Sequence, residues 1–492
     1  MKKRFLSLII IFFSFSVFSN EQKNIQNGSL IAENCYMYKL ENGLTLFVAE
    51  NHSVPLAYIE IAVRAGAITQ TKENAGLFHL YEHMMFKGNK KFSNTGKVQK
   101  ALSDMGTASW NGTTGIECVN YYFTIPSSEL ENGLDFWNNA IRFPLLDKNE
   151  FDIEKKVVIA EIQGDTSSPS KYIGSYINSH LFDKPWQLDP GGSVENIQNA
   201  TLEQLKEIQK TFYIPQNAAL FVGGDVEHKK VFELVKNIYG DWSNNGINFE
   251  QIEEAVETQS SKPFDKPYFC VVPFDKIDSR QTQIMIYFRG PDADFDEDAT
   301  YPADLLGFYM ENPESDFVQD FVNDPNLMIP SEDFLGSGYS TRRRTGLTSF
   351  LAISLCPPEK VVETTKNFYS KVMSSMKMYS KNENIVPSEK RKKIIQRLKD
   401  DKIFQTETFM GILTTLRYNW ITNSVDYYLN YEKNIENVSN EQIQNYLSKY
   451  IVEKNPLVIV LVNPSVYEKN EKIFNESGFE KVVSENSFWW NK

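Results

Sequence analysis

One short segment constrains the fold of this chain more than any other: residues 79–83, which read His-Leu-Tyr-Glu-His. It holds two of the five histidines in the chain, with a glutamate between them. Residues three and four apart share one face of an α-helix, so a helix here projects His79, Glu82 and His83 to the same side. Two imidazoles on adjacent turns can bind one Zn²⁺, and the carboxylate between them can then take a proton from a zinc-bound water. The segment therefore predicts a helical metal site.

The residues around this motif are mostly apolar, which indicates a helix that is buried on more than one side. Buried imidazoles need partners, because an unpaired polar group in an apolar setting costs free energy. A metal ion would satisfy both His79 and His83. The alternative is a surface helix that carries these polar groups by chance. The apolar neighbours Leu77, Phe78 and Met84 argue against that alternative.

A third metal ligand must come from elsewhere, because catalytic zinc sites usually have three protein ligands and one open position. The best candidate is Glu161, which lies inside an apolar run where an unpaired carboxylate would be unstable. Glu154 lies seven residues earlier, on nearly the same helix face, where it can hydrogen-bond to a ligand and orient it. Glu154 could equally be a solvated acid, like Glu150 and Asp152 beside it.

These residues resemble the zinc site of the pitrilysin/insulinase family of zinc metallopeptidases. Gly76–Gly88 is similar to the zinc helix of that family, which carries the inverted motif His-x-x-Glu-His. The third ligand of the family is the second glutamate of a Glu-x6-Glu pair nearly eighty residues downstream, which corresponds to Glu161, 78 residues after His83. Residues 111–122 resemble the Asn-Ala-x-Thr strand region of the family, with Val119 where a threonine is usual, and residues 212–225 resemble the end of its first domain. The resemblance covers residues 35–242.

The resemblance implies a role for each of these residues. His79, His83 and Glu161 would bind zinc, and Glu82 would be the general base. A peptide substrate would bind as an extra strand on a sheet edge, with Asn111 near the scissile bond. Asn111 could instead be a turn residue, because Asn-Gly is a common turn pair. The implied fold is α+β, with two similar domains that are each an antiparallel-rich mixed sheet backed by helices.

The pattern along the chain also predicts an α+β fold. Strands are predicted at 38–50, 55–66, 121–125, 218–222 and 281–288, and helices at 92–105, 130–142, 148–163, 202–211, 229–239 and 301–310. The predicted divisions are a signal peptide (1–19), a flexible segment (20–34), a catalytic domain (35–242), a linker (243–266) and a second domain (267–492).

The second domain is predicted to be a copy of the first without metal ligands. The order strand, arginine, helix occurs twice in the chain. The arginine is Arg64 in the first half and Arg289 in the second. Aligning these two arginines places Asp304, Gly307 and Phe308 at the positions of the metal motif. An unrelated α+β domain is the alternative.

The first residues predict export. Met1–Arg4 is basic, and the apolar stretch that follows, Phe5–Phe18, is too short for a comfortable membrane span. We therefore expect a signal peptide cleaved after Ser19 and a periplasmic or secreted protein, with an uncleaved anchor as the alternative. No other run of about eighteen apolar residues occurs, so no further membrane span is expected.

The net charge of the chain and its cysteine content limit the kinds of partner and of metal site that we expect. The formal net charge is −13, which argues against nucleic acid as a partner. Four cysteines, at positions 35, 118, 270 and 356, fit no zinc-cysteine motif. Export would permit disulfides, and free buried thiols are the alternative.

One feature of the family is missing. Many members hold the substrate carbonyl with an Arg-x6-Tyr pair, but residues 324–333 contain neither residue type, and Tyr339 and Arg342–Arg344 have the wrong order and spacing. Because carbonyl stabilisation needs such donors, either another chain supplies them or this site uses different ones. We expect a homodimer or a heterodimer with a related subunit. The favoured function is an exported zinc metalloendopeptidase acting on peptides or unfolded polypeptide segments. A non-catalytic or partner-dependent binding subunit of a heteromeric processing peptidase, and a zinc hydrolase of another substrate class, are the alternatives.

Overall fold

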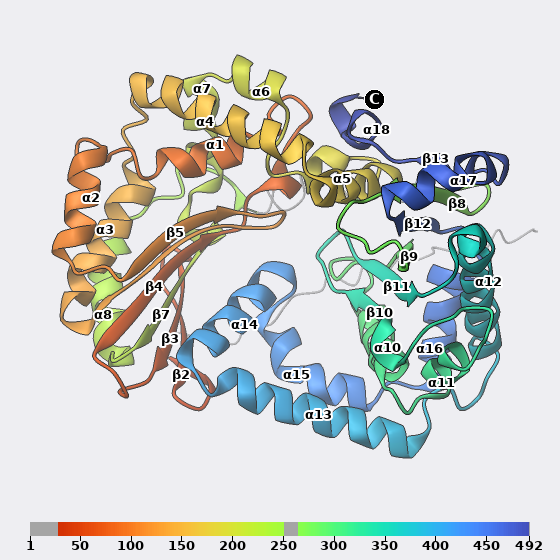
Figure 1. Cartoon of the computed structure of the whole chain (residues 1–492). Coiled ribbons are helices and arrows are strands. Elements are labelled where there is room, and N and C mark those ends of the chain that lie inside the picture. Colours follow the sequence, from red (N-terminus) through yellow and green to blue (C-terminus); the bar gives the residue numbers. More distant parts are fainter. Residues whose placement is uncertain (1–27, 250–263, 492) are drawn as a thin grey trace, which may run out of the picture.

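Two mixed β-sheets, one from each half of the chain, organise the computed structural model, which describes residues 28–249 and 264–491 (Figure 1). The first sheet has the strand order β1-β2-β3-β7-β4-β6-β5, and only the β3–β7 pair is parallel. Its strands are β1 (Ser29–Ala32), β2 (Cys35–Lys39), β3 (Thr45–Glu50), β4 (Leu56–Val63), β5 (Ser109–Thr114), β6 (Val119–Pro126) and β7 (Ala218–Gly224). The predicted signal peptide and most of the predicted linker lie outside the described residues.

The second sheet has the strand order β10-β11-β9-β12-β8-β13, with β8 parallel to β12 and β13. Its strands are β8 (Tyr268–Pro273), β9 (Thr282–Arg289), β10 (Leu335–Ser340), β11 (Leu347–Ser354), β12 (Leu457–Val462) and β13 (Glu480–Lys481). Each sheet is antiparallel-rich and backed by helices, which confirms the predicted fold class.

Helices of the first half cover one face of the first sheet and form its main core with Leu46 and Val48. They are α1 (Leu77–Met84), α2 (Thr95–Asp104), α3 (Leu130–Arg142), α4 (Lys148–Thr166), α6 (Val194–Asn199), α7 (Leu202–Phe212) and α8 (His228–Tyr239). In the second half α10 (Glu297–Glu311), α11 (Asp316–Val322), α12 (Val361–Tyr379), α13 (Ser388–Thr406), α15 (Val425–Glu436), α16 (Asn440–Leu447) and α17 (Pro464–Glu476) follow the same plan. The short helix α18 (Ser484–Ser487) lies instead beside α5 (Pro169–Leu181) of the first half. As the predicted duplication requires, α10 follows β9 as α1 follows β4.

Each half also supplies a helix that covers the other face of the opposite sheet. Helix α14 (Phe409–Thr422) of the second half packs its Leu413, Leu416 and Trp420 against Phe47 and Phe221 of the first sheet. Helix α5 (Pro169–Leu181) of the first half packs in the same way against β8 and β12. Both faces of β3, β7 and β12 are therefore buried, and these strands are almost continuously apolar rather than alternating.

Two segments differ from their predictions. Residues 29–32 form β1, paired antiparallel with β2, where we predicted a flexible segment. The predicted strand at 38–50 is two strands, because residues 40–44 turn between β2 and β3. Gly43 has φ +94°, a left-handed conformation that only glycine adopts without strain, so the Asn-Gly pair ends one strand and starts the next.

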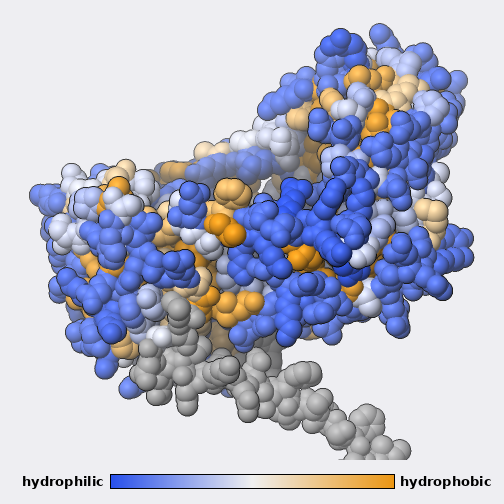
Figure 2. Space-filling view, turned by 90° about the horizontal axis from the view of Figure 1, so that it is seen from below, coloured by the Kyte–Doolittle hydropathy of each residue, from blue (hydrophilic) through white to orange (hydrophobic). Residues whose placement is uncertain are grey.

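The face of the molecule drawn in Figure 2 is largely polar. Figure 2, seen from below, shows a predominantly hydrophilic face broken by small apolar groups. Among the described residues, no helix combines the length and the apolar character that crossing a bilayer needs. All four cysteines are free thiols, so the alternative of unpaired cysteines holds.

Candidate metal and catalytic site

Helix α1 presents one polar face at the edge of the first core. It begins after Gly76, whose φ of +93° and close approach to the carbonyl oxygen of Gly191 leave no room for a Cβ atom. Leu77, Phe78 and most of the other residues of α1 are buried, which confirms a helix enclosed on more than one side. The remaining face carries the two histidines and the glutamate of the motif.

Three donor atoms converge at this face. The Nε2 atoms of His79 and His83 lie 3.2 Å apart, and each lies 3.7 Å from Oε2 of Glu161 on α4. Around a tetrahedral zinc ion with ligand distances of about 2.1 Å, ligand atoms are separated by about 3.4 Å. The triangle of donors thus has the size that one ion requires. Helix packing of α1 against α4 brings together residues 78 positions apart in the sequence.

The surroundings of both histidines favour a neutral or fixed imidazole ring, as a metal ligand requires. Burial, assisted by the neighbouring His83, lowers the pKa of His79 to about 4, so its imidazole is neutral at pH 7 and has a free lone pair. Nδ1 of His83 lies 2.9 Å from Oε2 of Glu154, and the other oxygen of Glu154 lies 2.6 Å from Nζ of Lys87. The contact with Glu154 fixes the ring of His83 so that Nε2 points at the donor triangle.

The structure corrects the reason we gave for choosing Glu161. The side chain of Glu161 is 48% exposed, whereas that of Glu154 is 5% exposed. The argument that a buried carboxylate needs a partner therefore applies to Glu154, which has two, and not to Glu161. The sequence around Glu161 is apolar because Val158 and Ile162 face the core. Glu161 itself lies on the open side of the same helix. Glu154 is buried and paired, so the alternative that it is a solvated surface acid is wrong.

The side chain of Glu82 lies against strand β5. Its carboxylate is buried, and burial raises its pKa to about 7. The hydroxyl of Thr114 donates to its Oε2 at 3.5 Å, and a Cβ atom at Gly112 would lie 2.5 Å from its Oε1. We did not single out Thr114 and Gly112 from the sequence. The only signal was their place in the segment 111–122, which resembles the strand region of the family.

Asn111 lies in β5 and not in a turn. Within residues 28–249 and 264–491 this strand is the outer one of the sheet and pairs only with β6, so in this part of the chain its other edge carries no strand. The side chain of Asn111 is exposed on that strand, and the chain turns four residues later, at Gly115–Cys118. The edge runs past Glu82, which lies on the same face of α1 as the two histidines.

The second half carries no comparable donor set at the aligned positions. Asp304 lies on α10 and accepts a hydrogen bond from the hydroxyl of Tyr431 at 2.8 Å, and the other two aligned positions are Gly307 and Phe308. Among the described residues, convergence of this kind is centred on His79 and His83: Glu82 and these two histidines offer ligand atoms within 4.8 Å of one another, and Glu161 lies 3.7 Å from both imidazoles.

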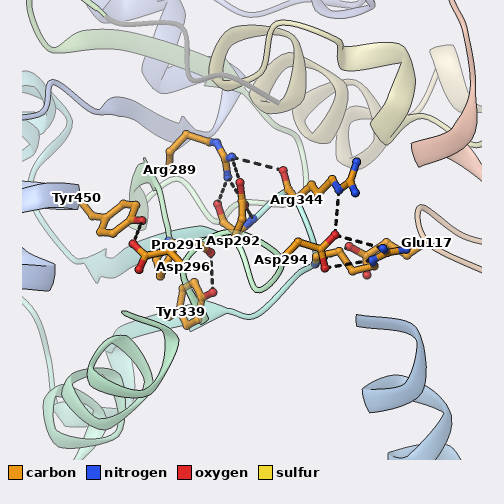
Figure 3. A network of polar contacts seen from close by, with 11 residues as sticks. Glu117, Arg289, Pro291, Asp292, Asp294, Asp296, Tyr339, Arg344 and Tyr450 are labelled. Carbon is orange, nitrogen blue, oxygen red and sulfur yellow. Dashed lines mark hydrogen bonds and ion pairs between the residues drawn. The ribbon is translucent and has the colours of Figure 1, made fainter. Parts of the chain in front are cut away.

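Tyr339 and the arginines near it are engaged in a network between the two halves (Figure 3). The hydroxyl of Tyr339 donates to the carbonyl of Pro291 at 2.6 Å, and Arg344 pairs with Asp294 at 2.9 Å. Glu117, in the turn that follows β5, accepts the backbone N–H of Arg343 at 2.9 Å. The network ties the β10–β11 hairpin to the end of the open-edged strand.

Comparison with known proteins finds two family models on this chain. "Insulinase (Peptidase family M16)" matches residues 46–187, and "Peptidase M16 inactive domain" matches residues 199–384. The zinc protease PqqE of Helicobacter pylori is 27% identical over 230 residues, which are 46% of this chain and 49% of that protein. The mitochondrial-processing peptidase subunit beta of Rattus norvegicus is 27% identical over 203 residues, 41% of each chain. The chain thus spans about half the length of the curated relatives it matches, or less.

The fold has solved counterparts. The periplasmic protease PqqL from Escherichia coli superposes with a TM-score of 0.69 at 15% sequence identity. The superposition covers 92% of this chain and 51% of PqqL. The two-sheet fold therefore occurs in a known architecture.

Proposed function

Because this chain belongs to the insulinase/pitrilysin family of peptidases, M16, we propose that it is an exported zinc metalloendopeptidase that cleaves peptides or unfolded polypeptide segments. The observation that carries the proposal is the triangle of donor atoms from His79, His83 and Glu161 beside a buried glutamate. Export is supported by the basic and then apolar first residues of the sequence.

His79, His83 and Glu161 would hold the zinc ion. When bound, zinc supplies a Lewis acid that polarises the peptide carbonyl and makes water more acidic. Glu82 takes a proton from the attacking water at its carboxylate and passes it to the leaving amine. The hydroxyl of Thr114 and the strand above it hold that carboxylate in place. Glu154 keeps the ring of His83 oriented.

The open edge of β5 would bind the substrate. Its unpaired backbone groups can pair with an extended peptide, which gives affinity with little dependence on sequence. Asn111, exposed on this strand, would contact the peptide near the cleaved bond. Only an extended backbone can pair in this way, which favours peptides and unfolded segments over folded proteins.

A second subunit would complete the site. Tyr339 and Arg344 are committed to contacts within this chain, so they are not free to stabilise the carbonyl of a substrate. A homodimer or a heterodimer with a related subunit would supply such donors. This observation also favours the second candidate function, that of a partner-dependent subunit of a heteromeric processing peptidase.

Purified protein can separate these functions. We expect it to contain one zinc per chain and to cleave quenched peptides, with activity lost to a chelator and restored by zinc. If it binds zinc but cleaves only after a copurifying subunit is added, the partner-dependent function is correct. A protein that binds no zinc would overturn both.

A further inference from the structure

Strand β5 meets different groups on its two faces. Gly112 and Thr114 lie against Glu82 of α1. Successive side chains of a strand point to opposite faces of the sheet, so Thr113, which lies between them, points away from α1. On this second face the neighbouring strands are covered by α14 of the second half.

A continuous series of polar contacts crosses this second face. The hydroxyl of Thr113 donates to Oδ1 of Asn120, its partner in register on β6. Nδ2 of Asn120 donates to Oε1 of Glu60 on β4 at 2.6 Å. The same oxygen lies 2.6 Å from Nη1 of Arg417 on α14. These four residues, which we call the cross-sheet network, therefore connect the outer strand of the first sheet to a helix of the second half.

The inner part of the cross-sheet network is buried and fully partnered. Glu60 is 1% exposed and Asn120 is 4% exposed. The second carboxylate oxygen of Glu60 accepts the hydroxyl of Tyr58 at 2.9 Å, so both of its oxygens have partners. Hydrogen bonds in a low-dielectric interior are strong and hold their members in one geometry. Thr113, the exposed outer member, is thus attached to a rigid base.

Strand β5 needs support on this face. It is six residues long and, within the described part of the chain, its backbone pairs only with β6. It also contains Gly112, and glycine weakens a strand because it loses more backbone entropy on folding. A larger residue cannot replace this glycine, since its Cβ atom would lie 2.5 Å from Oε1 of Glu82. The contact with Glu82 therefore costs strand stability, which the cross-sheet network offsets from the other face.

We propose that Thr113, Asn120, Glu60 and Arg417 are positioning residues that hold the open edge of β5 in the conformation that pairs with an extended peptide. An edge that is ordered before binding loses less entropy when the peptide pairs with it. The second half thus contributes to substrate binding through α14 without touching the substrate. The inference rests on the proposed peptidase function and adds to it a role for the second half.

The first test removes one hydroxyl. Thr113→Val keeps the shape of the side chain and suits a strand, so the fold is retained. For quenched peptides longer than the six residues of β5, we expect KM to rise by about fivefold or more while kcat stays within about twofold. Thr113→Ser, which keeps the hydroxyl, should restore the wild-type KM. A fall in kcat at unchanged KM would indicate only a loss of folded protein and would overturn the proposal, as would no change at all.

Thr124→Val is the matched control for this test. Thr124 lies on β6, two positions from Tyr122 and four from Asn120, so its side chain is on the same face. Among the described residues its hydroxyl makes no hydrogen bond that Thr124→Val would remove. KM and kcat of this variant should match the wild type. An equal rise of KM in Thr124→Val would assign the effect to this face of the sheet in general and overturn the specific role of the network.

Hydrogen exchange measures the order of the edge without a substrate. We expect the backbone amides of β5 that bond to β6 to exchange about fivefold faster or more in Thr113→Val than in the wild type. The amides of β1, at the opposite edge of the sheet, should exchange at the wild-type rate. Unchanged exchange in β5 would overturn the proposal.

A double-mutant cycle tests whether the second half takes part. Fluorescence anisotropy with the Glu82→Gln protein gives the Kd of a labelled peptide without turnover. Arg417→Leu should also raise this Kd, measured where circular dichroism shows the variant to be folded. Because members of one network act together, Arg417→Leu combined with Thr113→Val should raise the Kd no more than the larger single effect. Effects that multiply would show that the two residues act separately and would overturn the role of the second half.

These measurements also separate the inference from the proposed function. Peptide binding that Thr113→Val weakens, in a protein whose wild type cleaves nothing, would overturn the peptidase function and leave the positioning role standing. Cleavage whose KM is unaffected by Thr113→Val would do the reverse. A protein that neither binds nor cleaves peptides would overturn both.

Discussion

Oε2 of Glu154 lies 2.9 Å from Nδ1 of His83, and the opposite nitrogen of that imidazole faces Glu161, seven residues further along the same helix. One helix thus supplies both a candidate ligand and the group that orients another ligand. Because a carboxylate on Nδ1 fixes the tautomer and raises the basicity of Nε2, removing its charge should weaken metal binding without removing a ligand.

We therefore expect Glu154→Gln to lower zinc affinity by about 10- to 100-fold, as measured by competition with a chromogenic chelator. Asp152→Asn is the matched control, because Asp152 is exposed on the same helix and pairs only with Lys148. Unchanged zinc affinity in Glu154→Gln would show that the contact with His83 has no role in the metal site.

Glu82→Gln separates metal binding from proton transfer. The glutamine keeps the shape of the side chain but cannot accept the proton, so kcat should fall by about 10²- to 10⁴-fold. The donor triangle does not include Glu82, so zinc content measured by atomic absorption should stay at the wild-type value. His79→Ala is the contrasting variant, expected to lose both zinc and activity. Full activity in Glu82→Gln would reject Glu82 as the base.

The two halves are joined by an ion pair between Arg417 of α14 and Glu60 of β4, 2.6 Å apart. Glu60 is 1% exposed and also accepts hydrogen bonds from Tyr58 and Asn120, while Arg417 is 26% exposed. Arg417→Leu would leave a buried carboxylate without its countercharge, so we expect a loss of about 2–3 kcal/mol in the free energy of unfolding. Urea denaturation measures this loss. Lys100→Met, which breaks an exposed pair with Asp104, should cost less than about 0.5 kcal/mol.

Stability should depend on pH through Glu117. Burial, the largest influence, raises the pKa of Glu117 to about 7, above the usual glutamate value that the unfolded chain retains. Between these two pKa values the folded protein holds a proton that the unfolded chain has lost. Stability from this group is therefore present at the acidic end and falls as pH rises from about 4.5 to about 7, by roughly 3 kcal/mol in all.

Glu117→Gln should flatten this part of the pH profile, because glutamine keeps an acceptor for the N–H of Arg343 and does not titrate. Thermal unfolding of the two proteins at half-unit steps of pH measures the difference. Glu131→Gln, at an exposed position of α3, should leave the profile unchanged. A variant whose profile still falls as steeply as the wild type would assign the dependence to other groups.

Local pattern predicted much of the first half. The helix predicted at 148–163 is α4 at 148–166, and the helix predicted at 130–142 is α3 over the same residues. Both bury their apolar face against their own sheet, so the information is contained within the segment. Helix α5 and all the helices of the second half after α10 were not predicted. For two of them, α5 and α14, the physical reason is plain. Their apolar faces pack against the sheet of the opposite half, and the sequence of either helix alone does not identify that sheet as its packing partner.

The sequence by itself determined the donor types and their spacing, because side chains three and four residues apart on a helix must share a face. It also determined the α+β class, through segments whose apolar residues repeat with strand or helix period. Only the tertiary structure decided that Glu154 of α4 is buried and that Glu161 of the same helix faces the two imidazoles. Only packing placed Thr114 beside Glu82, and Arg417 beside Glu60. Such contacts join residues tens to hundreds of positions apart, and their geometry depends on how helices pack on sheets, which no local pattern contains.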